Sequence, residues 1–210
     1  MRLLIVGANG GIGRQAVEQA LAAGHHVTAV LRTPSKLELQ HPALNIVRGD
    51  VLLPGSFEKY LMGADAVISA IGGKMTVPTT LYSKGNQHLI HAMNLAGVRR
   101  VFFISSSAIE ISPALPFYVR LAEKYVLQKI LKHGYADQRI MESIVKSSDL
   151  DWTIMRPPQL TNKPATGVYR YAANRFLKNA LKISRADAAH FILHHLQDKE
   201  IYRSVVEMGY

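Results

Sequence analysis

The chain of 210 residues has no cysteine and no long apolar run. The absence of cysteine excludes disulfides, thiolate metal sites and a cysteine nucleophile. No stretch approaches the ~20 apolar residues needed to span a bilayer. The apolar run at residues 3–6 is also too short for a signal peptide, because a glycine follows it at once. These absences lead us to expect a cytoplasmic protein with no membrane partner.

Acidic residues are scarce, since 15 Asp and Glu stand against 25 Lys and Arg, giving a net charge of +10. An excess of basic residues is typical of proteins that bind nucleic acid, an anionic membrane surface or a small anionic ligand. The densest basic stretch, residues 163–185, carries no nucleic-acid-binding motif and is interpreted as a solvated surface. We therefore expect a small-molecule ligand such as a dinucleotide phosphate, and no nucleic acid. The positive charge should also draw anionic acceptors to the protein.

Short apolar strands alternate with amphipathic helices along the chain, and this alternation predicts a doubly wound, mostly parallel sheet. The length and the 48% hydrophobic content fit one Rossmann-like α/β domain covering residues 1–210. Val205 and Val206 are predicted to form a final edge strand. A helical insertion near residues 112–134 interrupts the alternation, and it is either a surface helix covering the sheet or a lid over the substrate. The expected strands are 2–6, 26–31, 45–48, 66–70, 101–104 and 152–155; the expected helices are 14–23, 79–96 and one capped by Ser184.

A glycine-rich loop at residues 7–13 lies between the first predicted strand and the first predicted helix. In such a loop one glycine makes the tight turn, another lets the backbone approach a pyrophosphate, and a third lets the helix pack on the strand. The amides at the helix N-terminus then face the phosphates. The position directly after a strand makes the motif specific. The predicted cofactor-binding residues here are Gly7, Asn9, Gly10, Gly11, Ile12 and Gly13.

The end of the second strand indicates which dinucleotide binds. An acidic residue there would hydrogen-bond the ribose 2′-hydroxyl of NAD. This chain has Arg32 and Lys36 instead, and no carboxylate between residues 31 and 36. The planar, forked guanidinium of Arg32 suits a 2′-phosphate, and Lys36 adds a second charge. The sequence therefore predicts NADP(H) as the cofactor.

Two further motifs, Gly49-Asp50-Val51 and Ser105-Ser106-Ser107-Ala108, together with the glycine loop, resemble atypical short-chain dehydrogenase/reductases of the NAD(P)H-binding, NmrA-like group. Within that group, three more stretches resemble biliverdin-IXβ reductase/flavin reductase: residues 156–159 with 164–167, residues 183–187, and Val77-Pro78-Thr79-Thr80. Gln159 stands where the flavin reductase has a histidine.

The resemblance implies roles for the matched positions. Asp50 and Val51 would flank the adenine, and Ala70, Ile71 and Gly72 would line the central part of the cofactor. Ser107 would lie near the nicotinamide, and Pro157 and Pro158 would wall its pocket.

Catalytic candidates follow from the Ser and Tyr-x-x-x-Lys pattern of short-chain dehydrogenases, in which a lysine lowers the pKa of a proton-donating tyrosine. The candidates are Ser107, Tyr135 and Arg139, with arginine in the place of lysine. Tyr125 has the literal spacing to Lys129, but is interpreted as a core or interface tyrosine.

Two functions fit these residues. One is an NADPH-dependent oxidoreductase that transfers a hydride to a flavin, quinone or similar planar acceptor. The other is a non-catalytic, NADP(H)-sensing NmrA-like regulator. Asp187, His190 and His194 share a helical face, but ordinary helix surfaces do so too, and no metal site is predicted. The pattern leaves the oligomeric state open.

Overall fold

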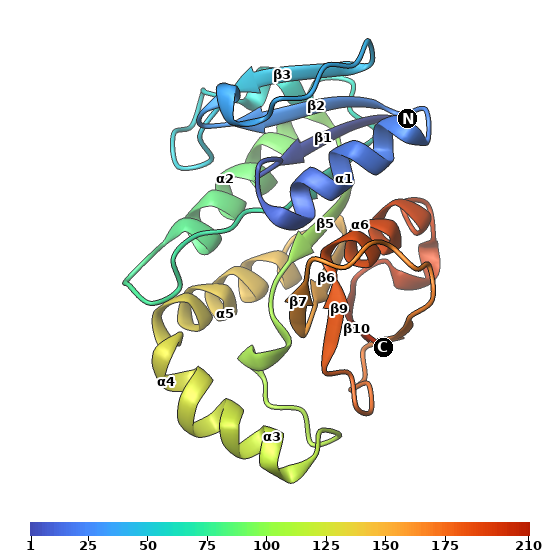
Figure 1. Ribbon diagram of the computed structural model, residues 1–210. Helices are drawn as coiled ribbons and strands as arrows, with labels where there is room; N and C mark the ends of the chain where they lie inside the picture. Colours follow the sequence, from blue (N-terminus) through green and yellow to red (C-terminus); the bar gives the residue numbers. More distant parts are fainter.

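The computed structural model describes residues 1–210, and its centre is an eight-stranded sheet in the order β3-β2-β1-β4-β5-β6-β10-β8 (Figure 1). Every neighbouring pair is parallel except β10 and β8. The strand order reverses between β1 and β4, which opens a crevice at their carboxyl ends. The doubly wound, mostly parallel sheet is thus confirmed. Its strands are β1 (Arg2–Val6), β2 (His26–Leu31), β3 (Leu44–Arg48), β4 (Ala66–Ser69), β5 (Arg100–Ile104), β6 (Asp151–Arg156), β8 (Arg170–Ala173) and β10 (Ser204–Gly209).

Two layers of helices cover the two faces of the sheet. Helices α1 (Gly11–Ala22) and α6 (Arg185–His194) pack together on one face, and α2 (Leu81–Ala96) and α5 (Lys132–Lys146) on the other. Successive strand side chains alternate between the faces, so Leu3 and Ile5 join one core cluster and Leu4 and Val6 the other. No helix combines the length and the apolar character needed to cross a membrane.

Several expectations are confirmed to the residue, including the bounds of β1 and β2 and the cap of α6. Ser184 Oγ accepts the Asp187 N–H at 2.8 Å. The expected edge position of residues 205 and 206 is wrong, because β10 lies between β6 and β8. Strand β8 supplies the edge by pairing antiparallel with β10, and the short sequence Arg-Tyr-Ala-Ala gives little signal for it.

Short elements connect the layers. Strands β7 (Gln159–Thr161) and β9 (Lys182–Ser184) form a separate parallel pair. The 3₁₀ turns are η1 (Pro34–Lys36), η2 (Glu58–Leu61), η3 (Ser107–Ile109) and η5 (Lys199–Ile201).

The insertion forms one continuous helical stretch from α3 (Phe117–Ala122) through the π-helical η4 (Glu123–Leu127) to α4 (Gln128–Ile130). It lies at the far end of the molecule from β3 rather than over a face of the sheet, which excludes the covering-helix interpretation (Figure 1). The Gln128 amide donates to the Ala108 carbonyl, and Gly134 N–H donates to Met75 O at 3.0 Å. Tyr125 is 54% exposed, so its interpretation as a core residue is wrong.

Candidate functional site

The glycine loop is packed so closely that side chains would not fit. Gly7 has φ +76°, in the left-handed region that favours glycine, and a Cβ there would collide with the Ala70 carbonyl. Gly10 N–H donates to Gly7 O at 2.9 Å, and a Cβ on Gly13 would collide with the same carbonyl. No side chain caps the start of α1, because Gly10 is its N-cap residue. The first amides of α1 are therefore open to an anionic ligand.

A cavity of about 330 Å³ lies in front of this loop, at the carboxyl ends of β1, β2, β3 and β4. The volume and the missing side chains form a cradle that fits the elongated, phosphate-bearing dinucleotide. Gly11, Ile12 and Gly13 do not line it, since Ile12 is buried in the core and Gly13 packs against Gly7. The predicted residues that do line it are Gly7, Asn9, Gly10, Arg32, Lys36, Asp50, Val51, Ala70, Ile71 and Gly72.

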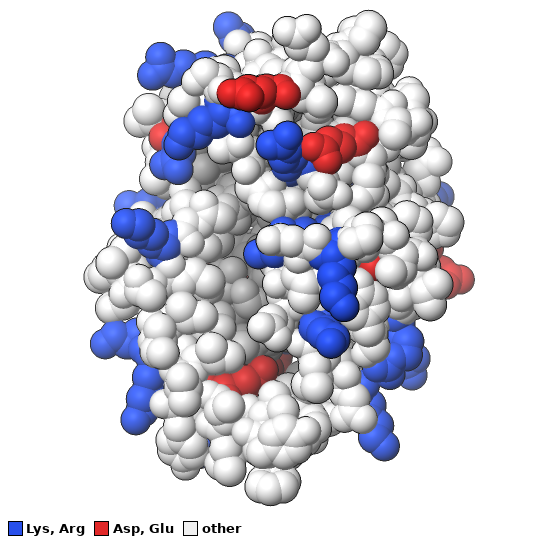
Figure 2. Space-filling view, viewed as in Figure 1, with Lys and Arg blue, Asp and Glu red and all other residues white.

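Two basic side chains of this cavity form no ion pair within the protein. Neither Arg32 nor Lys36 belongs to any of the ion pairs in the structure. The Asp50 carboxylate, by contrast, accepts the Leu52 N–H at 3.0 Å. Figure 2 shows Lys and Arg side chains bordering the upper part of the hollow on this face. Two unpaired cations beside open helix amides favour an anionic ligand.

Arg185 lies beside the glycine loop, although it does not line the cavity. Its side chain packs against Gly11 at the start of α1, where a Cβ on the glycine would collide with it. Its guanidinium donates to Asn162 Oδ1 at 2.6 Å. The sequence predicts the helix cap at Ser184, but no local pattern indicates that the end of β9 meets the glycine loop.

Ser107 and Pro157 lie side by side, because Ser107 N–H donates to the Pro157 carbonyl at 3.1 Å. The ends of β5 and β6 therefore bring the two predicted nicotinamide-side residues together. The adjoining space, about 10 Å³, is bordered by Ser107, Leu115, Pro158 and Leu177 among others. A planar acceptor would fit there only if the segment 112–115 or the segment 177–180 moved.

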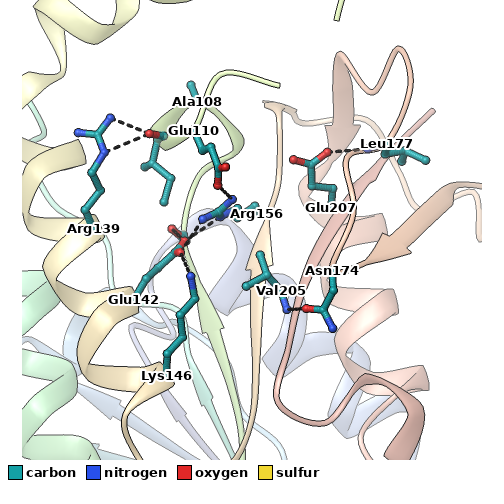
Figure 3. A network of polar contacts seen from close by, with 12 residues as sticks. Ala108, Glu110, Arg139, Glu142, Lys146, Arg156, Asn174, Leu177, Val205 and Glu207 are labelled. Carbon is teal, nitrogen blue, oxygen red and sulfur yellow. Dashed lines mark hydrogen bonds and ion pairs between the residues drawn. The ribbon is translucent and has the colours of Figure 1, made fainter. Parts of the chain in front are cut away.

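The predicted tyrosine and arginine are both in α5 but are not hydrogen-bonded to each other. Tyr135 is 3% exposed and packs on Ala108 and Ile109. Burial raises the pKa of Tyr135, the charge of Glu123 raises it further, and Arg139 opposes the shift. Arg139 donates twice to the Ile109 carbonyl, at 3.1 and 2.6 Å, and so fastens the η3 turn to α5 (Figure 3). Catalytic roles for Ser107, Tyr135 and Arg139 stay predictions.

A buried ion pair between Arg156 and Glu142 is the centre of a polar network that also includes the more exposed Glu110 and Lys146 (Figure 3). Arg156 donates to both oxygens of Glu142, at 2.9 and 2.7 Å, and to Glu110 at 2.7 Å. Ser105 donates to Glu142 at 2.8 Å, and Lys146 lies 3.3 Å from it. Burial alone would raise the pKa of Glu142, but Arg156, with help from Ser105 and Lys146, holds it below the ordinary value.

A second cavity, of about 370 Å³, lies between this network and the loop that follows β8. Glu207 borders it, and one carboxylate oxygen accepts the Leu177 N–H at 2.7 Å (Figure 3). The other oxygen of Glu207 has no hydrogen-bond partner, and neither has Trp152 Nε1. Burial raises the pKa of Glu207, and the nearby Glu110 charge raises it further, against the Leu177 N–H and Arg156.

The sheet order, the glycine loop at the reversal point and the unpaired cations together define a Rossmann-type nucleotide-binding protein. The chain belongs to the NAD(P)H-binding family, whose model matches residues 7–199.

Solved structures and curated relatives resemble the chain over most of its length. An oxidoreductase, ylbE, from Lactococcus lactis superposes with a TM-score of 0.81 at 24% identity, covering 100% of this chain and 90% of that one. A short-chain dehydrogenase/reductase from Veillonella parvula, in complex with NADP, gives 0.80 at 20% identity, covering 100% and 94%. The uncharacterized sugar epimerase YhfK of Bacillus subtilis is 30% identical, covering 95% of this chain and 89% of that protein.

The photosystem II assembly factor Ycf39 of Synechocystis is 32% identical over 139 residues, which is 63% of this chain. That match spans 43% of the length of the assembly factor.

Proposed function

We propose that the protein is an NADPH-dependent reductase of a flavin, quinone or similar planar small molecule. The observation that carries the proposal is the pair of unpaired cations, Arg32 and Lys36, at the end of β2 in the cavity of the glycine loop. A forked guanidinium binds a 2′-phosphate through two parallel hydrogen bonds, and an ammonium adds charge without fixed geometry. NADPH, when bound, supplies a hydride from its nicotinamide ring.

The residues around Ser107 support a planar, largely apolar acceptor. Pro158, Leu115 and Met208 border the small space there, and they offer flat or aliphatic surface. Such an acceptor needs little beyond positioning against the cofactor. The resemblance to flavin reductase supports the same class. The proton comes from solvent or from Tyr135, whose raised pKa keeps its phenol protonated at neutral pH.

NADPH oxidation with flavin mononucleotide and a short-chain quinone tests the proposal. We expect turnover with at least one of them, and a lower rate with NADH. Tyr135→Phe separates the proton sources, since loss of a general acid costs about 10²-fold or more in rate. Tyr125→Phe is the matched control on the exposed insertion. An effect within a few fold for Tyr135→Phe would assign the proton to solvent.

A second candidate function, a non-catalytic NADP(H)-sensing regulator, rests on Arg139. Its guanidinium is used by the Ile109 carbonyl and by Gln128 Oε1, at 3.0 Å, so no tyrosine–cation pair is assembled. Tight NADPH binding without oxidation by any acceptor of the panel would replace the reductase proposal with this one.

A further inference from the structure

The insertion carries the densest group of exposed apolar side chains in the molecule. Phe117 is 72% exposed, and Leu121 and Ile130 are about half exposed. Exposed apolar clusters of this kind mark binding surfaces in proteins. Seven large apolar side chains are exposed here: Phe117, Tyr118, Leu121, Tyr125, Val126, Leu127 and Ile130.

The helical stretch from 117 to 130 is turned with its polar side inward. Glu123 is its one buried residue, and Gln128 is half-buried and hydrogen-bonded to Ala108 and Arg139. A surface helix of a globular protein normally has the opposite arrangement, with its apolar stripe facing the core. The apolar side of this stretch is therefore available to something outside the chain.

The charges around the apolar side chains indicate what that is. Arg120, Lys124 and Lys129 are exposed, and Glu123, the only acidic residue between 112 and 134, is buried. A second copy of the chain would bring a like-charged helix to the same place. Basic residues combined with exposed aromatic and aliphatic ones are the signature of a helix lying in the interface of an anionic bilayer.

We propose that the surface formed by residues 117–130, called here the insertion surface, docks on anionic lipid bilayers. The stretch has fourteen residues, so it is about 21 Å long and can lie along the headgroup region without spanning the bilayer. The expectation of no membrane partner rested on the lack of a spanning segment, and peripheral docking needs none. The proposal does not depend on the reductase function.

Vesicle flotation of the full chain tests the proposal, with phosphatidylcholine alone compared with equal parts of phosphatidylcholine and phosphatidylglycerol. We expect binding to the mixed vesicles and at least about tenfold weaker binding to the neutral ones. Combining Phe117→Ser, Leu121→Ser and Tyr125→Ser should weaken binding to the mixed vesicles about tenfold or more. The matched control, Met62→Ser with Leu95→Ser and Val168→Ser, removes apolar side chains elsewhere that are at least as exposed, and it should bind like the wild type.

A charge series provides a test that does not depend on the apolar variant. Arg120→Glu, Lys124→Glu and Lys129→Glu together should abolish binding, whereas Lys163→Glu, Lys178→Glu and Lys182→Glu, with the same net charge, should leave most of it. Circular dichroism and cooperative thermal unfolding show that each variant is folded. Equal losses in the two charge variants, or no binding by the wild type, would overturn the proposal. A wild-type dimer that the serine variant turns into monomers would assign the insertion surface to a second copy instead.

Discussion

Two groups of cations in this molecule differ in whether the protein itself neutralises them. Arg32 and Lys36, beside the glycine loop, have no carboxylate partner. Arg156 and Lys146, behind Ser107, are paired with Glu142, and Arg156 also with Glu110. A cation without an internal partner is available to an external anion, whereas a buried pair mainly holds elements together. We therefore expect substitutions in the first group to change ligand binding and substitutions in the second to change stability.

The net charge of +10 does not say where on the molecule an anion is attracted, whereas the pairing of individual cations does. Arg32 and Lys36 place two unpaired positive charges at the cofactor cavity, and Arg120, Lys124 and Lys129 place three more on the insertion surface. The lining of the second cavity carries both signs, because Glu110 and Glu207 lie there with Lys146, Arg156 and Arg175. The attraction of anionic acceptors by the net charge stays a prediction.

The largest effect on stability should come from substituting Glu142, the carboxylate that pairs with Arg156 and Lys146. Glu142→Gln leaves Arg156 buried without its main partner, and we expect a loss of about 3–5 kcal/mol in the free energy of unfolding. Urea unfolding at neutral pH measures it. Arg32→Gln is the matched change in the unpaired group, and its stability should stay within about 0.5 kcal/mol of the wild type. Equal losses of stability in the two variants would contradict the distinction between paired and unpaired cations.

Substitutions in the glycine loop beside Arg32 and Lys36 should reduce NADPH affinity rather than stability. Gly10 has φ −74°, so a side chain is tolerated by the backbone, but its Cβ would lie 3.2 Å from the Gly7 carbonyl and border the cavity. We expect Gly10→Val to weaken NADPH binding by about 100-fold or more, near 2.7 kcal/mol, in a chain that still folds. The NADPH affinity of Gly10→Ala should lie between those of the wild type and of Gly10→Val. Calorimetric titration measures both, and a folded valine variant with wild-type affinity would mean that the loop is not the site.

Removing one free cation should sharpen the comparison further. Arg32→Ala removes a charge-assisted hydrogen bond, and we expect NADPH binding to weaken by about 1.5–3 kcal/mol while NADH binding changes little. The exposed Lys182→Ala serves as a control for general charge. Dissociation constants for both cofactors decide the matter, and equal wild-type affinities for NADPH and NADH would contradict the assignment.

The smallest effect should be a gain in stability rather than a loss. Glu207 is buried with an oxygen that lacks a partner, and its pKa is raised, so its charged form costs stability at neutral pH. We expect Glu207→Gln to stabilise the fold by about 1 kcal/mol above the raised pKa, an increase in Tm of about 2–4 °C.

Thermal unfolding across a pH series checks the sign. The advantage of Glu207→Gln should vanish as pH falls and the wild-type carboxyl takes up its proton. The pKa of Glu142 is lowered instead, so its contribution is full above the ordinary glutamate value and is lost on acidification. Destabilisation by Glu207→Gln at neutral pH would mean that the unpaired oxygen has a partner.

The parts of the fold that follow from local patterns were predictable. An apolar run that ends in glycine indicated β1, and a run rich in β-branched residues indicated β2. The glycine loop with Arg32 and Lys36 indicated one cavity that the structure assembles. These residues are close in sequence to the elements that position them. Strand β8 was missed because its pairing with β10 is a tertiary contact, and the four residues of β8 carry no clear alternation.

The acceptor side was less predictable for the same reason. Periodicity places Phe117, Leu121 and Tyr125 on one side of a helix but does not say whether that side faces the core. The spacing of Tyr135 and Arg139 gave a catalytic candidate, yet the guanidinium is used by a carbonyl 30 residues away in sequence. Contacts such as Arg185 with Gly11 depend on where β9 lies, which no local pattern specifies.

The single tryptophan gives the molecule an optical reporter of its own. Trp152 borders the cavity beside Glu207, and its buried indole N–H has no hydrogen-bond partner. Emission from such an apolar, unbonded indole is expected at short wavelength, and an occupant that accepts the N–H would shift it to longer wavelength. Trp152 lies in β6 and borders the second cavity but not the cofactor cavity. Occupancy of the second cavity is therefore measurable in the unlabelled protein.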